Sequence, residues 1–152
     1  MKKLNFIQAN KEISEHEINA VEKELGIKLP TDYRQFLLAN NGGLPEECIF
    51  DIPNLGQSSL VFYGVHTGEE HSDFLLACMA YRNRLPGNSF PVGFDPGGNL
   101  ICLVAEDKHD WALYFWDHER DNSPPELSKM YRLADSFSDF IDSLQYEENE
   151  AW

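Results

Sequence analysis

The sequence has few cysteines, few basic residues and no long apolar run. Its three cysteines, Cys48, Cys78 and Cys102, lie far apart in apolar surroundings, which is typical of reduced core residues. No apolar run approaches the roughly 20 residues that a membrane helix needs. The N-terminal segment turns polar by Gln8, which argues against a secretory signal. We therefore expect a cytoplasmic protein with reduced cysteines.

The scarcity of basic residues leaves a strongly acidic chain. Its 26 acidic and 12 basic residues give a net charge of −14. This imbalance argues against nucleic acid and anionic membranes as partners, and it favours encounter with a basic protein. The acidic charge has a second possible role that does not involve a partner, because net charge also keeps a small protein soluble.

Length and composition predict one globular domain over residues 1–152. The core is expected over about 12–145, and residues 146–152 form an acidic tail that we expect to fray. Hydrophobic residues make up 42% and aromatic residues 12% of the chain, which excludes a disordered protein. We find no internal repeat, low-complexity segment or linker.

Periodicity and capping signals predict the helices. Ser14 and Glu17 form a capping box before an amphipathic run that ends at Gly26. Pro30 suits the first turn of a second helix, and "NNGG" at 40–43 ends it. Two further helices are expected over 72–83 and 135–144.

Apolar and aromatic runs between these helices predict the strands. We expect strands over 48–52, 60–65, 90–94, 99–105 and 111–118, with a short one near 130–134. The connections after residue 90 are too short for parallel crossovers. The predicted fold is therefore α+β, with a mainly antiparallel sheet packed against several helices.

The segment "DPGGN" at 95–99 could be either a ligand cradle or a tight turn. Asp95, Asn99 and Glu106 fall at positions 1, 5 and 12 of an EF-hand loop. However, Gly97 offers no side-chain ligand at position 3, and Leu100 stands where the loop needs glycine. No Walker sequence is present. Proline followed by two glycines favours a hairpin turn.

No catalytic or metal-binding constellation stands out. The five histidines show no HExxH spacing, and the chain contains no CxxC. Asp117 and His118 could form a general base at a strand end, but a hydrogen-bonded strand end accounts for them more simply. No GxSxG elbow surrounds a serine. We expect a protein without enzymatic activity or cofactor, although a zinc site built from distant residues stays open.

Taken in order, several blocks resemble one known family. "VEKELGIKLPTDYRQFLLANNGG" is similar to the N-terminal signature of the SMI1/KNR4 family, also called the SUKH superfamily. "FPVGFDPGGNLICL", "LYFWDHE" and "LADSFSDFIDSL" resemble its later blocks in the right order. The resemblance covers about 12–145, and it is weakest over 44–89. It implies an α+β protein-binding domain without catalysis, and bacterial members similar to this chain are commonly immunity proteins that neutralise a toxin, often a nuclease.

Our main hypothesis is therefore an immunity protein whose acidic face binds a basic toxin domain. Acidic residues near aromatic ones are the candidates for that face: Glu69, Glu70, Asp73, Asp110, Trp111, Asp117, Glu119 and Asp121. Tyr114 and Trp116 are further candidate anchors, and strand alternation predicts that about half of the aromatic residues fill the core. The signature residues, by contrast, are expected to be caps and core: Leu29, Pro30, Tyr33, Phe36, Gly42 and Gly43.

Two other classes of function stay open from the sequence. One is a regulatory scaffold with an endogenous partner, since fungal members of the family act in cell-wall regulation. The other is a metal or small-molecule domain that uses Asp95, Asp117 and His118. The sequence leaves the oligomeric state undecided, and the strand at 111–118 could pair between subunits.

Overall fold

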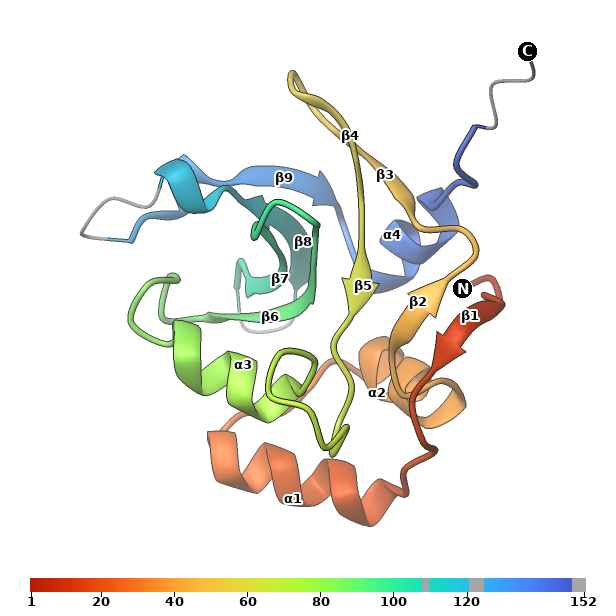
Figure 1. The fold of residues 1–152 in the computed structure, drawn as a ribbon. Helices are drawn as coiled ribbons and strands as arrows, with labels where there is room; N and C mark the ends of the chain where they lie inside the picture. Colours follow the sequence, from red (N-terminus) through yellow and green to blue (C-terminus); the bar gives the residue numbers. More distant parts are fainter. Residues whose placement is uncertain (108–109, 121–124, 149–152) are drawn as a thin grey trace.

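The computed structural model describes residues 1–107, 110–120 and 125–148. Within these residues the chain forms four α-helices, a seven-stranded sheet and a two-stranded sheet (Figure 1). The elements in chain order are β1 (Phe6–Ala9), α1 (Glu15–Leu25), α2 (Thr31–Ala39), β2 (Gly43–Pro45), β3 (Ile49–Ile52), β4 (Gly56–Ser59), β5 (Val61–Phe62), α3 (Phe74–Tyr81), β6 (Ser89–Phe94), β7 (Leu100–Ala105), β8 (Trp111–Trp116), the 3₁₀ turns η1 (His118–Arg120) and η2 (Leu127–Lys129), β9 (Tyr131–Ala134) and α4 (Phe137–Ser143).

The large sheet has the strand order β1-β2-β5-β6-β7-β8-β9, and every neighbouring pair in it is antiparallel. From β6 to β9 the strands follow one another as a meander, as the short connections after residue 90 predict. The hairpin of β3 and β4 forms the separate small sheet. The predicted α+β class is confirmed.

The first two helices begin and end where the sequence signals them. Ser14 accepts a hydrogen bond from the backbone N–H of Glu17, and Gly26 adopts the left-handed conformation that closes α1. Pro30 precedes α2 in an extended conformation. Among the described helices α1 is the longest, with 11 residues, and none is both long and apolar enough to cross a membrane.

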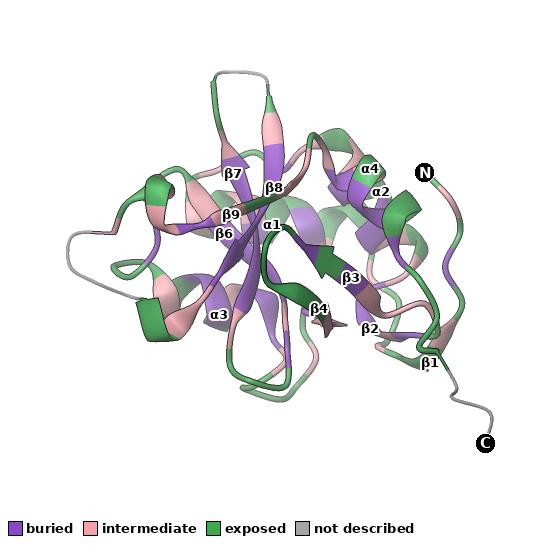
Figure 2. Ribbon diagram, turned by 90° about the horizontal axis from the view of Figure 1, so that it is seen from above, coloured by how far each residue is buried: buried purple, intermediate pink, exposed green. Residues whose placement is uncertain are grey.

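A cluster of aromatic rings joins the helices to the sheet. The ring of Phe137 on α4 lies 5.0 Å from both Tyr33 and Phe36 of α2. Phe36 in turn lies 4.8 Å from Phe62 on β5. Figure 2 shows buried residues running along β6, β7 and β8, which form the centre of the sheet. The aromatic core therefore packs α2, which carries the signature residues Tyr33 and Phe36, against α4 and the sheet.

The segment at 95–99 is the tight turn between β6 and β7. The Asp95 backbone N–H donates to the carbonyl of Asn99, and Gly98 has a φ of +87°. The buried Asp95 carboxylate accepts hydrogen bonds from the backbone N–H groups of Gly97 and Asn99, the Asn99 amide and the Ser58 hydroxyl. With these four hydrogen bonds the carboxylate stabilises the turn, in agreement with the predicted hairpin.

Three strands were not predicted, each for a local reason. β1 has mostly exposed side chains and so lacks an apolar pattern. β2 is only three residues long and ends in a proline. β4 has the polar sequence GQSS, which is typical of a loop, although the strand pairs with β3 along its whole length. The predicted strand over 60–65 shortens to the two residues of β5.

Candidate partner-binding groove

The structure separates the predicted binding residues into two groups. Asp110 and Trp111 lie at the start of β8, whereas Asp117 and Glu119 follow its end. Six residues of strand place these ends roughly 17–20 Å apart. Asp121 lies outside the described residues. The predicted residues therefore do not form one continuous face.

The remaining candidates lie on the side of Asp117 and Glu119. Glu70 and Gly98 line the same hollow, and the ring of His118 lies 3.6 Å from the position of a Cβ built on Gly98. Glu69 and Glu70 are exposed in the loop before α3. Loop 69–70 and η1 are therefore at the same end of the sheet.

Asp73 differs from the other candidates because it is buried. Its carboxylate accepts hydrogen bonds from the backbone N–H of Leu76, in the first turn of α3, and from that of Thr67. The structure thus gives Asp73 the role of a helix cap, and the sequence signal for that role was its position before an apolar helical run.

Among the three aromatic candidates of β8, only Trp111 is partly exposed. Tyr114 and Trp116 are buried, at 7% and 5% exposure. The Trp116 ring packs against Tyr81 and lies under the guanidinium of Arg84. These contacts remove Tyr114 and Trp116 from the candidate anchors and leave Trp111.

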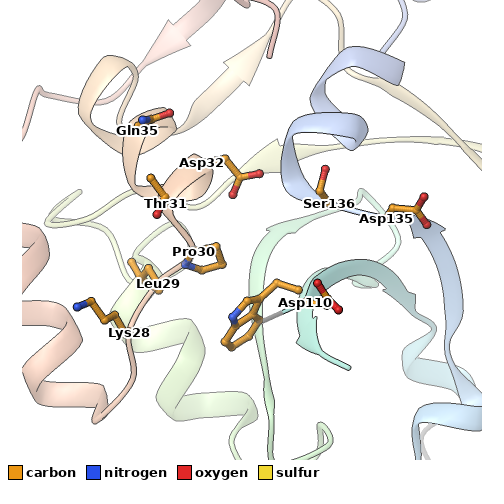
Figure 3. A pocket seen from close by; sticks show the side chains of 10 residues that line it. Lys28, Leu29, Pro30, Thr31, Asp32, Gln35, Asp110, Asp135 and Ser136 are labelled. Atoms are coloured by element: carbon orange, nitrogen blue, oxygen red, sulfur yellow. The ribbon is translucent and has the colours of Figure 1, made fainter. Parts of the chain in front are cut away.

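Asp110 and Trp111 line an open groove of about 630 Å³. Two further segments, distant in sequence from β8 and from each other, form its other walls (Figure 3). One runs from the α1–α2 connection into the first turns of α2, and the other is the entry to α4. The other lining residues are Lys28, Leu29, Pro30, Thr31, Asp32, Gln35, Asp135 and Ser136.

Contacts with β7 and β6 position the backbone and the ring of Trp111. As the first residue of β8, it pairs with Ala105 of β7. Its ring lies 5.2 Å from Phe90 of β6 and packs against the core while remaining partly exposed. Because the inner contacts fix the ring, its exposed part can meet a ligand at little cost in side-chain entropy.

Three carboxylates and one ammonium group give the groove a negative character. Asp110 and Asp135 are exposed, and the Asp135 carboxylate forms an ion pair with Arg132. Asp32 points toward the start of α4 (Figure 3), where it accepts hydrogen bonds from Ser138. Lys28 is the one cation of the lining. The groove lining therefore includes a fixed acid, Asp32, and two exposed acids, Asp110 and Asp135.

These groups support recognition of a cation. An indole face attracts ammonium and guanidinium groups, and carboxylates form their strongest hydrogen bonds with the same cations. The Ser136 hydroxyl caps α4, because it accepts a hydrogen bond from the backbone N–H of Asp139. Among the described residues, no three His, Cys, Asp or Glu side chains gather closely enough to hold a metal ion.

Sequence reasoning missed the helical side of the groove. Asp32 lies within the family signature and Asp135 is the first residue of the helix expected over 135–144, and neither is among the predicted binding residues. No local pattern shows that the first turns of α2 and α4 meet beside β8. The sequence did single out Trp111 and Asp110, by an aromatic residue next to an acid.

Comparison with known proteins agrees with the order of these motifs. The sequence model of the SMI1 / KNR4 family (SUKH-1) matches residues 12–143. The chain is also 29% identical, over 164 aligned positions, to the SPbeta prophage-derived uncharacterized protein YokK of Bacillus subtilis (strain 168). That alignment covers 95% of this chain and 79% of the relative. The resemblance drawn from the motifs is confirmed, and the chain belongs to the SMI1 / KNR4 family (SUKH-1).

Proposed function

We propose that this protein is a non-catalytic immunity protein, which binds a basic toxin domain and blocks its working surface. Membership of the SMI1 / KNR4 family supports an immunity-type, protein-binding role at the level of the family. The observation that carries the proposal for this chain is the groove at Trp111, where a fixed aromatic ring stands among acidic side chains.

In this proposal the groove receives an arginine or lysine side chain of the toxin. The cation lies against the Trp111 indole, and Asp110 and Asp135 accept its hydrogen bonds. Asp135 exchanges its exposed ion pair with Arg132 for the incoming cation at little cost, because exposed pairs of this kind contribute little free energy. An aromatic anchor with neighbouring charges is typical of an interface hot spot.

The charge of the whole chain supports the same partner. A net charge of −14 attracts a cationic surface over long distances, and a nuclease carries such a surface to hold its substrate. Charge complementarity of this kind raises association rates to about 10⁸–10⁹ M⁻¹s⁻¹ at low salt. Binding would then occlude the toxin's substrate groove sterically and electrostatically.

The test starts with capture of partners from the source cell, using the tagged chain as bait. The expected partner is a protein with a basic domain that is toxic when expressed alone and harmless when co-expressed with this chain. Reproducible, stoichiometric capture of a non-toxic endogenous protein would overturn the immunity proposal and support a regulatory scaffold.

The captured domain then serves as the probe for the groove. Trp111→Ala is expected to weaken its affinity by about 30-fold, the size of a hot-spot loss. The double variant Asp110→Asn/Asp135→Asn should weaken binding and flatten its salt dependence. Asp117→Asn/Glu119→Gln is the matched control, since it removes the same charge beyond the other end of β8. Equal losses in the two double variants would show that the groove is not the binding site.

A further inference from the structure

Helix α3 has an unusual composition for a helix at a protein surface. Its sequence, FLLACMAY, contains no charged residue. A helix that is hydrophobic on all sides is normally buried. Yet the side chains of Leu76 and Met79 on α3 are 44% and 50% exposed. Of the large hydrophobic residues exposed in the described chain, they are the two that share a helix.

One side of α3 is covered by the protein itself. Phe74, Ala77 and Cys78 are buried, and the helix packs against β6 and α1 (Figure 1). The opposite side presents Leu76, Met79 and Ala80 at spacings of three and four residues, and we call these three residues the α3 face. A hollow of about 410 Å³, lined by Leu76, Ala80 and residues of the sheet, adjoins it. The α3 face is therefore apolar and uncovered.

The charges at the two ends of α3 have opposite signs. Exposed Glu69 and Glu70 precede the helix, and exposed Arg82 and Arg84 follow it. Arg84 lies over the rings of Tyr81 and Trp116, at 5.5 and 5.0 Å, which holds it near the C-terminal end of the helix. An antiparallel copy of the same helix would place acids opposite arginines at both ends.

We propose that the α3 face binds a second copy of this chain, with the two α3 helices antiparallel across a two-fold axis. Leu76 of each copy then packs against Met79 of the other, and Glu70 faces Arg82 at each end. A two-fold interface uses one self-complementary patch, which is the pattern that α3 and its flanks present. The two arginines disfavour a basic protein as the occupant.

This inference does not depend on the proposed toxin binding. The groove at Trp111 contains no residue of α3, so each surface can be tested while the other stays intact. The two associations also respond to salt in opposite ways. Binding of a basic partner weakens with salt, whereas two chains of charge −14 repel one another less when salt screens them.

The contact is small, which sets its expected strength. Two turns of exposed helix bury less than a standard interface of about 1,200–2,000 Å², so we expect a dissociation constant in the micromolar range. Analytical ultracentrifugation of the purified full chain, from about 1 µM to about 1 mM, should therefore show a monomer–dimer equilibrium. The dimer fraction should rise with salt.

Matched variants test whether the dimer uses the α3 face. Leu76→Glu and Met79→Glu should each leave a monomer over this concentration range. Leu55→Glu and Ile7→Glu are the controls, because each adds the same charge at an equally exposed apolar residue elsewhere, 53% and 64% exposed respectively. Circular dichroism confirms that each variant is folded. Dimerisation lost in the controls but kept in the α3 variants would overturn the proposal, as would a monomeric wild type.

A charge exchange tests the antiparallel arrangement itself. Arg82→Glu places acids opposite acids and should weaken the dimer by about tenfold, whereas Glu70→Lys/Arg82→Glu should restore it. Equal weakening in the single and double variants would contradict this pairing. If Leu76→Glu abolished binding of the captured toxin while the wild type stayed monomeric, the α3 face would belong to that partner instead.

Discussion

The carboxylate of Asp32 on α2 accepts two hydrogen bonds from Ser138 on α4, one from the backbone N–H and one from the hydroxyl, each 2.9 Å long. The N–H groups in the first turn of a helix have no partner within the helix. Asp32 therefore caps a helix 106 positions later in the chain, and it fixes the two helix ends that form one side of the groove.

Asp32→Ala should lower the free energy of unfolding by about 1–2 kcal/mol, because it leaves the Ser138 N–H without its cap. Urea denaturation measures the change. Ser138→Ala should cost less, since the backbone bond remains. A double-mutant cycle should show coupling between the two residues, and additive losses would argue against the hydrogen bonds. Asp139→Ala removes an exposed acid of the same helix turn and serves as control.

Asn41 connects the end of α2 to the segment after β5. Its side chain is buried, accepts a hydrogen bond from the Val65 N–H at 2.8 Å and donates one to the Val65 carbonyl at 2.7 Å. It also donates to the carbonyl of Lys11. The amide thus pairs with one residue as a neighbouring strand would, in a place where the sequence shows only a helix stop.

Asn41→Ala should destabilise the protein by about 2–4 kcal/mol, since it leaves buried backbone groups unsatisfied. Thermal and urea unfolding both report this loss. Asn40→Ala is the matched control, because it changes the same residue type one position earlier, where the residue is only partly buried. Similar losses at the two positions would show that the amide contacts contribute little.

Gly42 and Gly26 both have positive φ angles, but their surroundings differ. A Cβ on Gly42 would lie 2.3 Å from the backbone carbonyl oxygen of Tyr63, whereas one on Gly26 would meet nothing within 4 Å. Gly26→Ala should cost only the left-handed strain, about 1 kcal/mol. Gly42→Ala should cost several times more or prevent folding. Urea denaturation measures both losses, and equal midpoints for Gly26→Ala and Gly42→Ala would contradict this difference.

Features that depend on neighbouring residues could be predicted from the sequence. The cap at Ser14, the stop at Gly26 and the turn at 95–99 each need only a few adjacent side chains, and each is confirmed. β1 could not be found in this way, because its short, exposed segment gains its structure by pairing with β2, whose residues lie more than 30 positions later.

The candidate groove shows the same limit of prediction from local sequence. The sequence singles out Trp111 as a candidate anchor, but Asp32 and Asp135 line the same groove only because α2 and α4 pack against one another. The expected alternation of buried and exposed side chains is also wrong for β8. All residues of this strand after Trp111 are buried. A strand that is covered on both faces has no exposed side, so alternation cannot separate core residues from surface ones.

Glu106 accepts three hydrogen bonds from residues on two strands at the end of the sheet. Arg132 on β9 donates from Nε at 3.0 Å and from Nη2 at 2.8 Å, and the Tyr114 hydroxyl on β8 also donates. The bonds from Arg132, followed by that from Tyr114, hold the pKa of Glu106 below its ordinary value of 4.5, against the opposing effects of desolvation and Asp107. The charged carboxylate is therefore favoured in the folded state.

This lowered pKa predicts how Glu106 affects stability as the pH changes. A carboxylate with a lowered folded pKa stabilises the protein fully above about pH 4.5, and this contribution is lost as the pH falls through the folded pKa. Glu106→Gln should therefore be less stable than the wild type at pH 7, and the difference should shrink toward pH 3. Urea midpoints across this range measure it. Glu24→Gln, at an exposed position of α1, should follow the wild-type curve, and a constant deficit in Glu106→Gln would show that charge is not what stabilises this contact.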